Sequence, residues 1–90
     1  MLVALIARDK KDALQTRLDN RAAHLAYIEE TGVVTQAGPL LGDEGAMIGS
    51  LVILDVADVD AARDWAANDP YAKAGLFENV ELIPWKKVVG

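Results

Sequence analysis

The stretch Leu2-Val3-Ala4-Leu5-Ile6-Ala7 is apolar at every position, and the charged Arg8-Asp9-Lys10-Lys11 ends it. An apolar run this short is typical of a strand, and a strand that is apolar on both sides is buried on both faces. A second such stretch, Met47-Ile48-Gly49-Ser50-Leu51-Val52-Ile53-Leu54, is interrupted only by Gly49-Ser50. The sequence therefore predicts two central strands of one sheet, with a close approach by another group at Gly49.

The segment from Asp12 to Thr31, between these strands, changes to the helical period. Asp12 is expected to cap the helix or to lie in its first turn, and Gly32 is expected to end it. Apolar residues recur every three or four positions along one stripe, which predicts that this stripe faces the core. The stripe consists of Leu14, Leu18, Ala22, Leu25 and Ile28.

A second seam of the same helix carries Arg17, Arg21, His24 and Ile28, which an advance of 100° per residue places along the flank of the apolar stripe. His24 is therefore expected at the border between core and solvent. In the simplest interpretation, His24 is a partly exposed helix residue, and the arginines are solvated charges whose stems cover the core edge.

The remaining segments predict two further strands and a second helix. Val33–Ala37 is a short strand ended by Gly38-Pro39, which either punctuates the chain or lets backbone amides line a pocket, and residues 40–46 read as a loop. Asp58 is predicted to cap a helix that runs to about Asn68. Its inward face would hold Val59, Ala62, Trp65 and Ala66, and a short turn would follow over residues 71–75. Phe77–Val89 alternates like a strand, and Pro84 indicates a sheet edge.

The order strand, helix, strand, strand, helix, strand predicts an α+β ferredoxin-like βαββαβ fold, with one domain spanning residues 1–90. The sheet would be four-stranded and antiparallel, with Leu2–Ala7 and Met47–Leu54 as its central pair. Both helices would cover one face, so the apolar residues on the helix-free sheet face need another cover. Leaving such side chains exposed costs roughly 1.5–3 kcal/mol each, which favours a homodimer formed through that face.

Composition excludes several classes of partner. The net charge is -5, the chain has no cysteine, and 52% of its residues are hydrophobic. Nucleic acids and anionic membranes attract clustered Lys and Arg, so neither is an expected partner. The lack of cysteine fits a cytoplasmic protein, and residues 1–7 are interpreted as a strand rather than a signal peptide. One histidine without any cysteine leaves no ligand-spaced set, so no metal or cofactor is expected.

The stretch Asn68-Asp69-Pro70-Tyr71 predicts a carboxylate with a fixed direction, because Pro70 pushes Asp69 out of the α region. His24 is the only histidine of the chain, and histidine is the side chain that ordinarily titrates near neutrality. A pair formed by His24 and Asp69 would be the natural centre of proton-transfer chemistry.

Taken together, these motifs resemble the YCII-related (YciI-like) family of small α+β proteins, which belongs to the dimeric α/β-barrel class. The resemblance covers nearly the whole chain. Its motifs are Arg17-Leu18-Asp19-Asn20-Arg21-Ala22-Ala23-His24-Leu25, Ala37-Gly38-Pro39, Gly49-Ser50, Ala62-Arg63-Asp64-Trp65-Ala66-Ala67-Asn68-Asp69-Pro70-Tyr71, Ala74-Gly75 and Pro84-Trp85-Lys86-Lys87-Val88. The resemblance implies an active site built on His24 and Asp69. Some relatives are similar to dehydrochlorinases or other lyase-like enzymes that act on chlorinated hydroxylated aromatics.

The first functional hypothesis is a small-molecule enzyme in which His24 is a general acid or base and Asp69 orients its ring. Arg21 would attract an anionic or phenolic substrate, and Ser50, Tyr71 and the Gly38-Pro39 segment would contact it. Ser50 has no base partner at motif spacing, so a hydrogen-bonding role is favoured over a nucleophilic one.

Two other interpretations remain open at this stage. The same cleft in a dimer could hold a small anionic metabolite without any reaction, as a binding or accessory module. In a purely structural alternative, Asp69 pairs with Arg21 or caps a helix, and His24 only borders the core.

Overall fold

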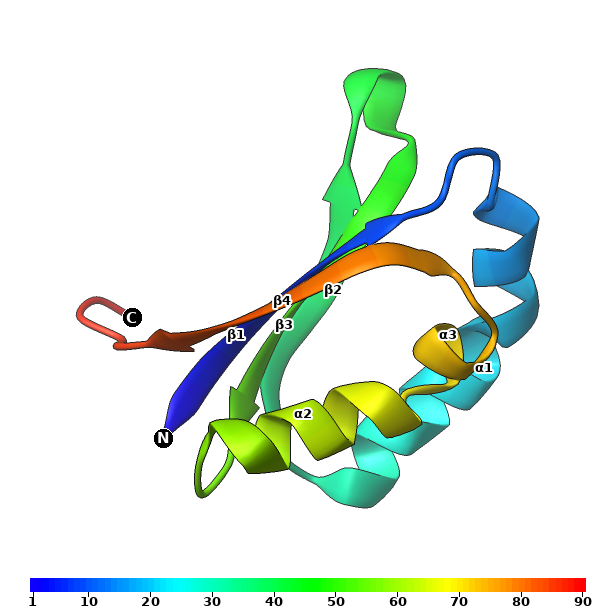
Figure 1. The fold of residues 1–90 in the computed structure, drawn as a ribbon. Coiled ribbons are helices and arrows are strands. Elements are labelled where there is room, and N and C mark those ends of the chain that lie inside the picture. Colours follow the sequence, from blue (N-terminus) through cyan, green and yellow to red (C-terminus); the bar gives the residue numbers. More distant parts are fainter.

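The computed structural model describes residues 1–90, which form four strands and three α-helices (Figure 1). The elements are β1 (Leu2–Asp9), α1 (Leu14–Thr31), β2 (Val34–Leu41), the 3-10 turn η1 (Asp43–Gly45), β3 (Met47–Asp55), α2 (Val59–Asn68), α3 (Pro70–Lys73) and β4 (Phe77–Trp85).

The strands form one antiparallel sheet in the order β2-β3-β1-β4. β1 and β3 are the central pair, with Leu5 opposite Val52, and all three helices lie on one side of the sheet (Figure 1). This is the predicted ferredoxin-like α+β arrangement. The strand order confirms the prediction, because the two apolar runs form the two central strands of the sheet.

The core lies between the central strands and the helices. Alternate residues of β1 and β3 point toward the helices, as the pleat of a strand requires, and they pack against α2. The fully or nearly buried members of this cluster are Val3, Leu5, Ala7, Val52, Leu54, Ala62 and Trp65. The predicted inward face of α2 is therefore confirmed, as is its cap, because the Asp58 side chain accepts a hydrogen bond from the backbone N–H of Ala61 at 2.8 Å.

Gly49 allows β1 and β3 to pair closely. A Cβ atom at this position would overlap the backbone carbonyl oxygen of Ala7 in the neighbouring strand. The predicted close approach at Gly49 is thus confirmed, and any side chain there would push the two central strands apart.

The limits of two strands differ from the prediction. β2 continues through Gly38-Pro39 to Leu41, so the expected end at Ala37 is wrong. The reason is that β2 pairs only with β3, and an edge strand tolerates a proline whose missing N–H would face solvent. β4 ends at Trp85 and not at Val89, whereas its predicted position at a sheet edge is confirmed.

The orientation of α1 also differs from the prediction. Leu14, Leu18 and Leu25 are about half exposed, at 50%, 46% and 51%, whereas Arg17 and His24 are only 3% and 6% exposed. The helix therefore turns its polar seam inward. This is tolerated because no buried side-chain nitrogen or oxygen lacks a hydrogen-bond partner, and a paired polar group escapes most of the cost of burial.

The start of α1 differs from the prediction, whereas its end agrees with it. Asp12 has a positive φ of 58° and does not cap the helix, whose N-cap is Ala13. Gly32 ends the helix in the left-handed conformation with φ 65°, as predicted.

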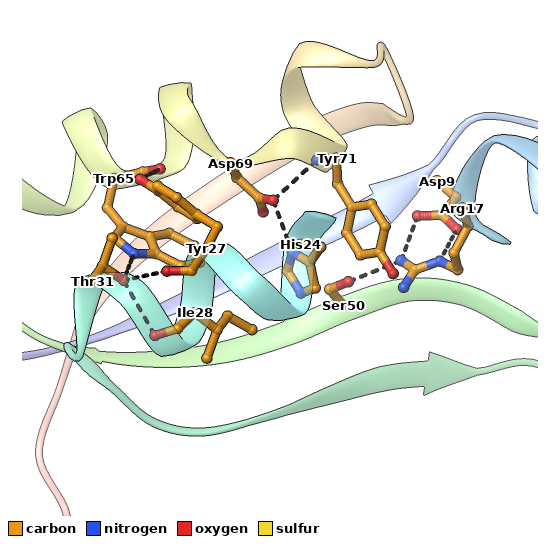
Figure 2. Close-up of polar contacts among 10 residues, drawn as sticks. All are labelled: Asp9, Arg17, His24, Tyr27, Ile28, Thr31, Ser50, Trp65, Asp69 and Tyr71. Atoms are coloured by element: carbon orange, nitrogen blue, oxygen red, sulfur yellow. Dashed lines mark hydrogen bonds and ion pairs between the residues drawn. The ribbon is translucent and has the colours of Figure 1, made fainter. Parts of the chain in front are cut away.

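A hydrogen-bonded clamp joins the C-terminal end of α1 to α2. The indole Nε1–H of Trp65 donates to Thr31 Oγ1 at 2.9 Å, and the Tyr27 hydroxyl donates to the carbonyl oxygen of Trp65 at 2.8 Å (Figure 2). Burial raises the pKa of Tyr27, so this hydroxyl keeps its proton at neutral pH. The clamp fixes α1 relative to α2, and so sets the distance between His24 on α1 and Asp69 after α2.

None of the helices combines the length and the apolar character that crossing a membrane requires.

Candidate active site

His24 and Asp69 meet although they lie far apart in the sequence. The distance from His24 Nδ1 to Asp69 Oδ1 is 2.8 Å, and both side chains are buried (Figure 2). Asp69 lies between α2 and α3 in an extended conformation, as expected of a residue before proline. It is also the N-cap of α3, because its side chain accepts a hydrogen bond from the backbone N–H of Tyr71.

The direction of the hydrogen bond between His24 and Asp69 follows from this cap. Asp69 Oδ1 accepts the backbone N–H of Tyr71 at 3.0 Å, so the same oxygen acts as an acceptor toward His24. Nδ1 of His24 therefore carries a proton. Nε2, the other ring nitrogen, bonds to no group of the chain, and it is the atom that can take up or release a proton toward a ligand.

The Tyr71 ring stacks on one face of the His24 imidazole. The two rings stack with centroids 4.0 Å apart and an interplanar angle of 15°, and the Arg17 guanidinium carbon lies 4.8 Å from the Tyr71 ring centroid. Burial raises the pKa of Tyr71, and Asp69 adds to this effect, although Arg17 and Arg21 act in the opposite direction. Tyr71 is therefore a neutral phenol at neutral pH, and its ring supports the orientation of His24.

Arg17 forms a second buried group with Asp9 and Ser50. Its Nε and Nη2 donate to the two carboxylate oxygens of Asp9 at 2.8 and 2.9 Å, and Nη2 also donates to Ser50 Oγ at 2.8 Å (Figure 2). Burial by itself lowers the pKa of Arg17, but the hydrogen bonds and the charge of Asp9 outweigh it and raise the pKa. Arg17 therefore remains a cation, and it binds Asp9 in a bidentate geometry.

A cleft of about 250 Å³ opens between α1 and the β2–β3 edge of the sheet. Polar groups come from α1 and β3, and the rest of the wall is largely apolar. The lining residues are Arg17, Arg21, His24, Leu25, Ile28, Ala37, Gly38, Pro39, Met47, Ser50 and Val52. Arg21 is exposed and forms no ion pair with a carboxylate of the chain. The cleft thus offers an uncompensated cation, a titratable imidazole and a hydroxyl beside an apolar wall.

The structure brings most of the predicted site residues to this cleft: His24, Arg21, Gly38, Pro39 and Ser50 line it. Asp69 and Tyr71 lie behind His24, buried at 1% and 3% exposure, and contact the histidine from there.

Sequence reasoning missed the role of Arg17. It was expected to be a solvated charge, and it is buried instead. Its spacing from Arg21 and His24, four and seven residues, already placed it on the same side of α1. Its partner Asp9 read only as part of the charged segment that closes the first strand.

No group of three or more His, Cys, Asp or Glu side chains is arranged so that it could hold a metal ion. The chemistry that the described side chains offer is proton transfer at His24 Nε2 beside hydrogen-bond donors and a cation.

Comparison with known proteins finds a dehydrochlorinase among the similar structures. The chain is 38% identical to 5-chloro-2-hydroxyhydroquinone dehydrochlorinase from Burkholderia phenoliruptrix, whose structure contains 2,5-dihydroxybenzoquinone. The match covers 96% of this chain and 94% of that chain, with a TM-score of 0.87. This likeness supports a dehydrochlorinase-like or lyase-like role on a small molecule. An antibiotic biosynthesis monooxygenase, at 13% identity and a TM-score of 0.55 over 97% of this chain and 100% of that chain, shares the fold alone.

Sequence matches cover the same length. The chain is 41% identical to "Protein YciI" of Escherichia coli, over 98% of this chain and 99% of that protein. The model of the YCII-related domain matches residues 1–86. With these matches and this fold, the chain belongs to the YCII-related family.

Proposed function

We propose that the protein is a small-molecule lyase that removes a proton and a chloride ion from a chlorinated, hydroxylated aromatic ring, with His24 as acid and base and Asp69 as its orienting partner. The observation that carries this proposal is the 2.8 Å hydrogen bond between His24 Nδ1 and Asp69 Oδ1, which leaves Nε2 free in a cleft with Arg21 and Ser50. The 38% identity to a dehydrochlorinase over nearly the whole chain supports the class of reaction.

His24 is the only acid–base group that this reaction needs. In the first step, a ring hydroxyl gives its proton to Nε2 of His24. The imidazolium then returns a proton to the carbon that bears chlorine, and the deprotonated oxygen becomes the oxygen of a ketone. In the second step, another hydroxyl gives its proton to Nε2. The carbon–chlorine bond then breaks, and its electron pair leaves with chloride. The products are a hydroxyquinone and HCl, so atoms and electrons balance without an oxidant, and Asp69 stabilises the imidazolium in both steps.

Arg21 is the group that selects an acidic substrate. A hydroxylated ring becomes an oxyanion when its hydroxyl loses a proton, and an unpaired guanidinium beside the imidazole favours that charge. The apolar residues of the cleft, among them Ile28 and Val52, suit the flat face of a ring.

The function is tested by incubating the protein with 5-chloro-2-hydroxyhydroquinone and measuring the release of chloride. We expect Arg21→Gln to raise KM about 3- to 10-fold while kcat changes less, because a partly exposed cation contributes to binding throughout the reaction. Arg63→Gln is the matched control, since Arg63 is an exposed arginine of α2 that pairs with Asp60 and does not line the cleft. Equal behaviour of the two variants would contradict the role of Arg21. Binding of the compound without any chloride release would instead favour a non-catalytic ligand-binding module.

We also propose that two copies associate through the helix-free face of the sheet. Several apolar side chains are substantially exposed there, including Leu51 at 39%, Ile83 at 45% and Trp85 at 40%. Leu51 and Trp85 line a groove of about 470 Å³. Ile83 lies beside this groove, opposite Ala4 of β1. Burial of each such side chain contributes roughly 1.5–3 kcal/mol, so covering them by a second copy is favourable.

The dimer is tested by analytical ultracentrifugation at micromolar concentration. We expect the wild type to sediment as a dimer. Ile83→Asp is expected to shift it to the monomer, because a carboxylate buried at the interface without a partner is costly. Val80→Asp is the matched control: Val80 belongs to the same strand and is 39% exposed, but it points to the helix side, opposite Ala7. A monomeric wild type, or a dimer that tolerates Ile83→Asp, would exclude this interface.

A further inference from the structure

We propose that Met47 sets the length of the ligand: it forms the end wall of the cleft and restricts the site to molecules with a single ring. Beyond Met47 lies a second hollow, which a smaller residue at this position would join to the cleft. This inference rests on the proposed function, which it deepens by naming the residue that limits the size of the substrate.

Met47 lies at one end of the cleft. Arg17, near the start of α1, donates a hydrogen bond to Ser50 of β3, so the first turns of the helix lie beside the first half of this strand. Met47 begins β3 and lines the cleft at this end. His24 lies seven residues after Arg17, about two helical turns further along the same wall. A ring beside the imidazole therefore has Met47 as its boundary toward the start of β3.

A second hollow of about 220 Å³ lies beyond this end of the cleft. It is formed by the segment from Asp9 to Leu14, which joins β1 to α1, and by Met47 and Ile48 of β3. Met47 is the only residue that lines both the hollow and the cleft. It is half-buried and divides the two spaces.

A β-bulge brings Met47 to the cleft. Side chains alternate along a strand, so the pattern that turns Ser50 toward the helices would turn Ile48, and not Met47, the same way. The pairing of β3 with β2 shifts at this point, because Leu41 lies opposite Met47 whereas the residue before Leu41 lies opposite Gly49. One residue of β3 is therefore extra, and such bulges re-aim side chains next to active sites.

The volume of the cleft suits one ring. It is about 250 Å³, below the roughly 300–1,000 Å³ of pockets that hold drug-sized ligands. The apolar, polarisable thioether of methionine makes favourable contacts with the edge of an aromatic ring. A second ring directed toward the start of β3 would overlap Met47. Without this side chain, the cleft and the hollow would form one longer space with room for both rings.

The experiment compares the dissociation constants of two probes by isothermal titration calorimetry, and it requires no turnover. The probes are 2,5-dihydroxybenzoquinone and its 3-phenyl derivative, which carries one ring more. We expect the wild type to bind the one-ring probe at least about 10-fold more tightly, because crowding a well-packed site is costly. Met47→Ala is expected to bind the two-ring probe roughly 10- to 100-fold more tightly than the wild type does. Equal affinity of the wild type for both probes, or no gain in Met47→Ala, would overturn the inference.

Two further variants separate the end wall from other effects. Met47→Leu keeps an apolar side chain of similar volume, so it should retain the preference for the one-ring probe. Ile48→Ala shortens the neighbouring side chain, which lines the hollow but not the cleft, and it should leave that preference unchanged. If Ile48→Ala gains as much affinity for the two-ring probe as Met47→Ala does, a loosened strand admits the ligand and the inference is wrong. Circular dichroism confirms that each variant is folded.

The failures of the two proposals are distinguishable. A protein that prefers the one-ring probe through Met47 but releases no chloride contradicts only the proposed reaction. Chloride release by a wild type that binds both probes equally contradicts only the present inference. A wild type that binds neither probe would overturn the present inference, because it commits the cleft to a ligand with one hydroxylated ring.

Discussion

Asp69→Asn is expected to lower chloride release from 5-chloro-2-hydroxyhydroquinone roughly 10²- to 10⁴-fold, the range that general acid–base catalysis contributes. The reason is that Asp69 Oδ1 accepts the Nδ1–H of His24 at 2.8 Å, which keeps the lone pair on Nε2 and stabilises the imidazolium. Without the carboxylate, the ring loses the negative charge that balances the imidazolium.

Asparagine is the informative replacement because it leaves the cap of α3 in place. Asp69 also accepts the backbone N–H of Tyr71, and asparagine caps a helix about as well as aspartate. Asp69→Asn therefore separates catalysis from folding, whereas an alanine would remove both functions. The urea midpoint of Asp69→Asn is expected to stay near that of the wild type.

His24→Gln is the companion variant, and it is expected to lose activity to a similar extent. If the two residues act as a unit, the double variant loses little more than either single variant. A spectroscopic check is available because His24 is the only histidine. A proton–nitrogen correlation spectrum of the ring should show the proton on Nδ1 in the wild type. Activity that survives both substitutions would refute the role of the pair.

The sheet could be predicted from the sequence because its signals are local. The doubly apolar runs at Leu2–Ala7 and Met47–Leu54 carry the mark of central strands in each run itself, and β1 and β3 are indeed central. Asp58 caps α2 through a contact within three residues. Such features need no knowledge of distant partners.

The orientation of α1 could not be predicted in this way, because distant partners decide it. The leucine stripe and the polar seam are both regular at the helical period, and hydrophobicity alone favours the leucines as the buried side. The polar seam is buried because Arg17 finds Asp9 on β1 and His24 finds Asp69 beyond α2. The periodicity of α1 by itself identifies neither partner. The same holds for Pro39, whose place within a strand depends on β2 being at an edge.

The candidate site was only partly predictable for the same reason. The Asp69-Pro70 step restricts one backbone position, and a single histidine limits the choice of base, so the sequence itself suggests this pair. The group formed by Asp9, Arg17 and Ser50 comes from three different elements, and each residue has an ordinary interpretation when taken alone. Only the 2.8 and 2.9 Å contacts between them reveal a buried group.

Arg17→Met is expected to destabilise the protein by about 3 to 5 kcal/mol, because it leaves the Asp9 carboxylate buried without a partner. The side chains of this pair are 4% and 6% exposed, so water cannot replace the lost contacts. The measurement is urea unfolding at a fixed protein concentration, which matters because association would stabilise the folded chain.

Arg63→Met is the matched control for this prediction. Arg63 also pairs with an aspartate, Asp60, but the two side chains are 65% and 85% exposed, and an exposed ion pair contributes only about 0 to 1 kcal/mol. The two variants make the same chemical change, one in a buried ion pair and the other in an exposed one. If they cost the same, the pair formed by Arg17 and Asp9 does not carry the expected energy.

The double variant Arg17→Met with Asp9→Asn decides where the cost of the single variant comes from. If the uncompensated charge of Asp9 is the cause, removing that charge should restore at least half of the lost stability, because an apolar side chain of similar volume replaces a buried ion pair at little cost. If the double variant is no more stable than Arg17→Met, the loss comes instead from the contacts of Arg17 with Ser50 and Tyr71. In that case the guanidinium itself holds this side of the cleft together, and Asp9 serves mainly to keep it in place.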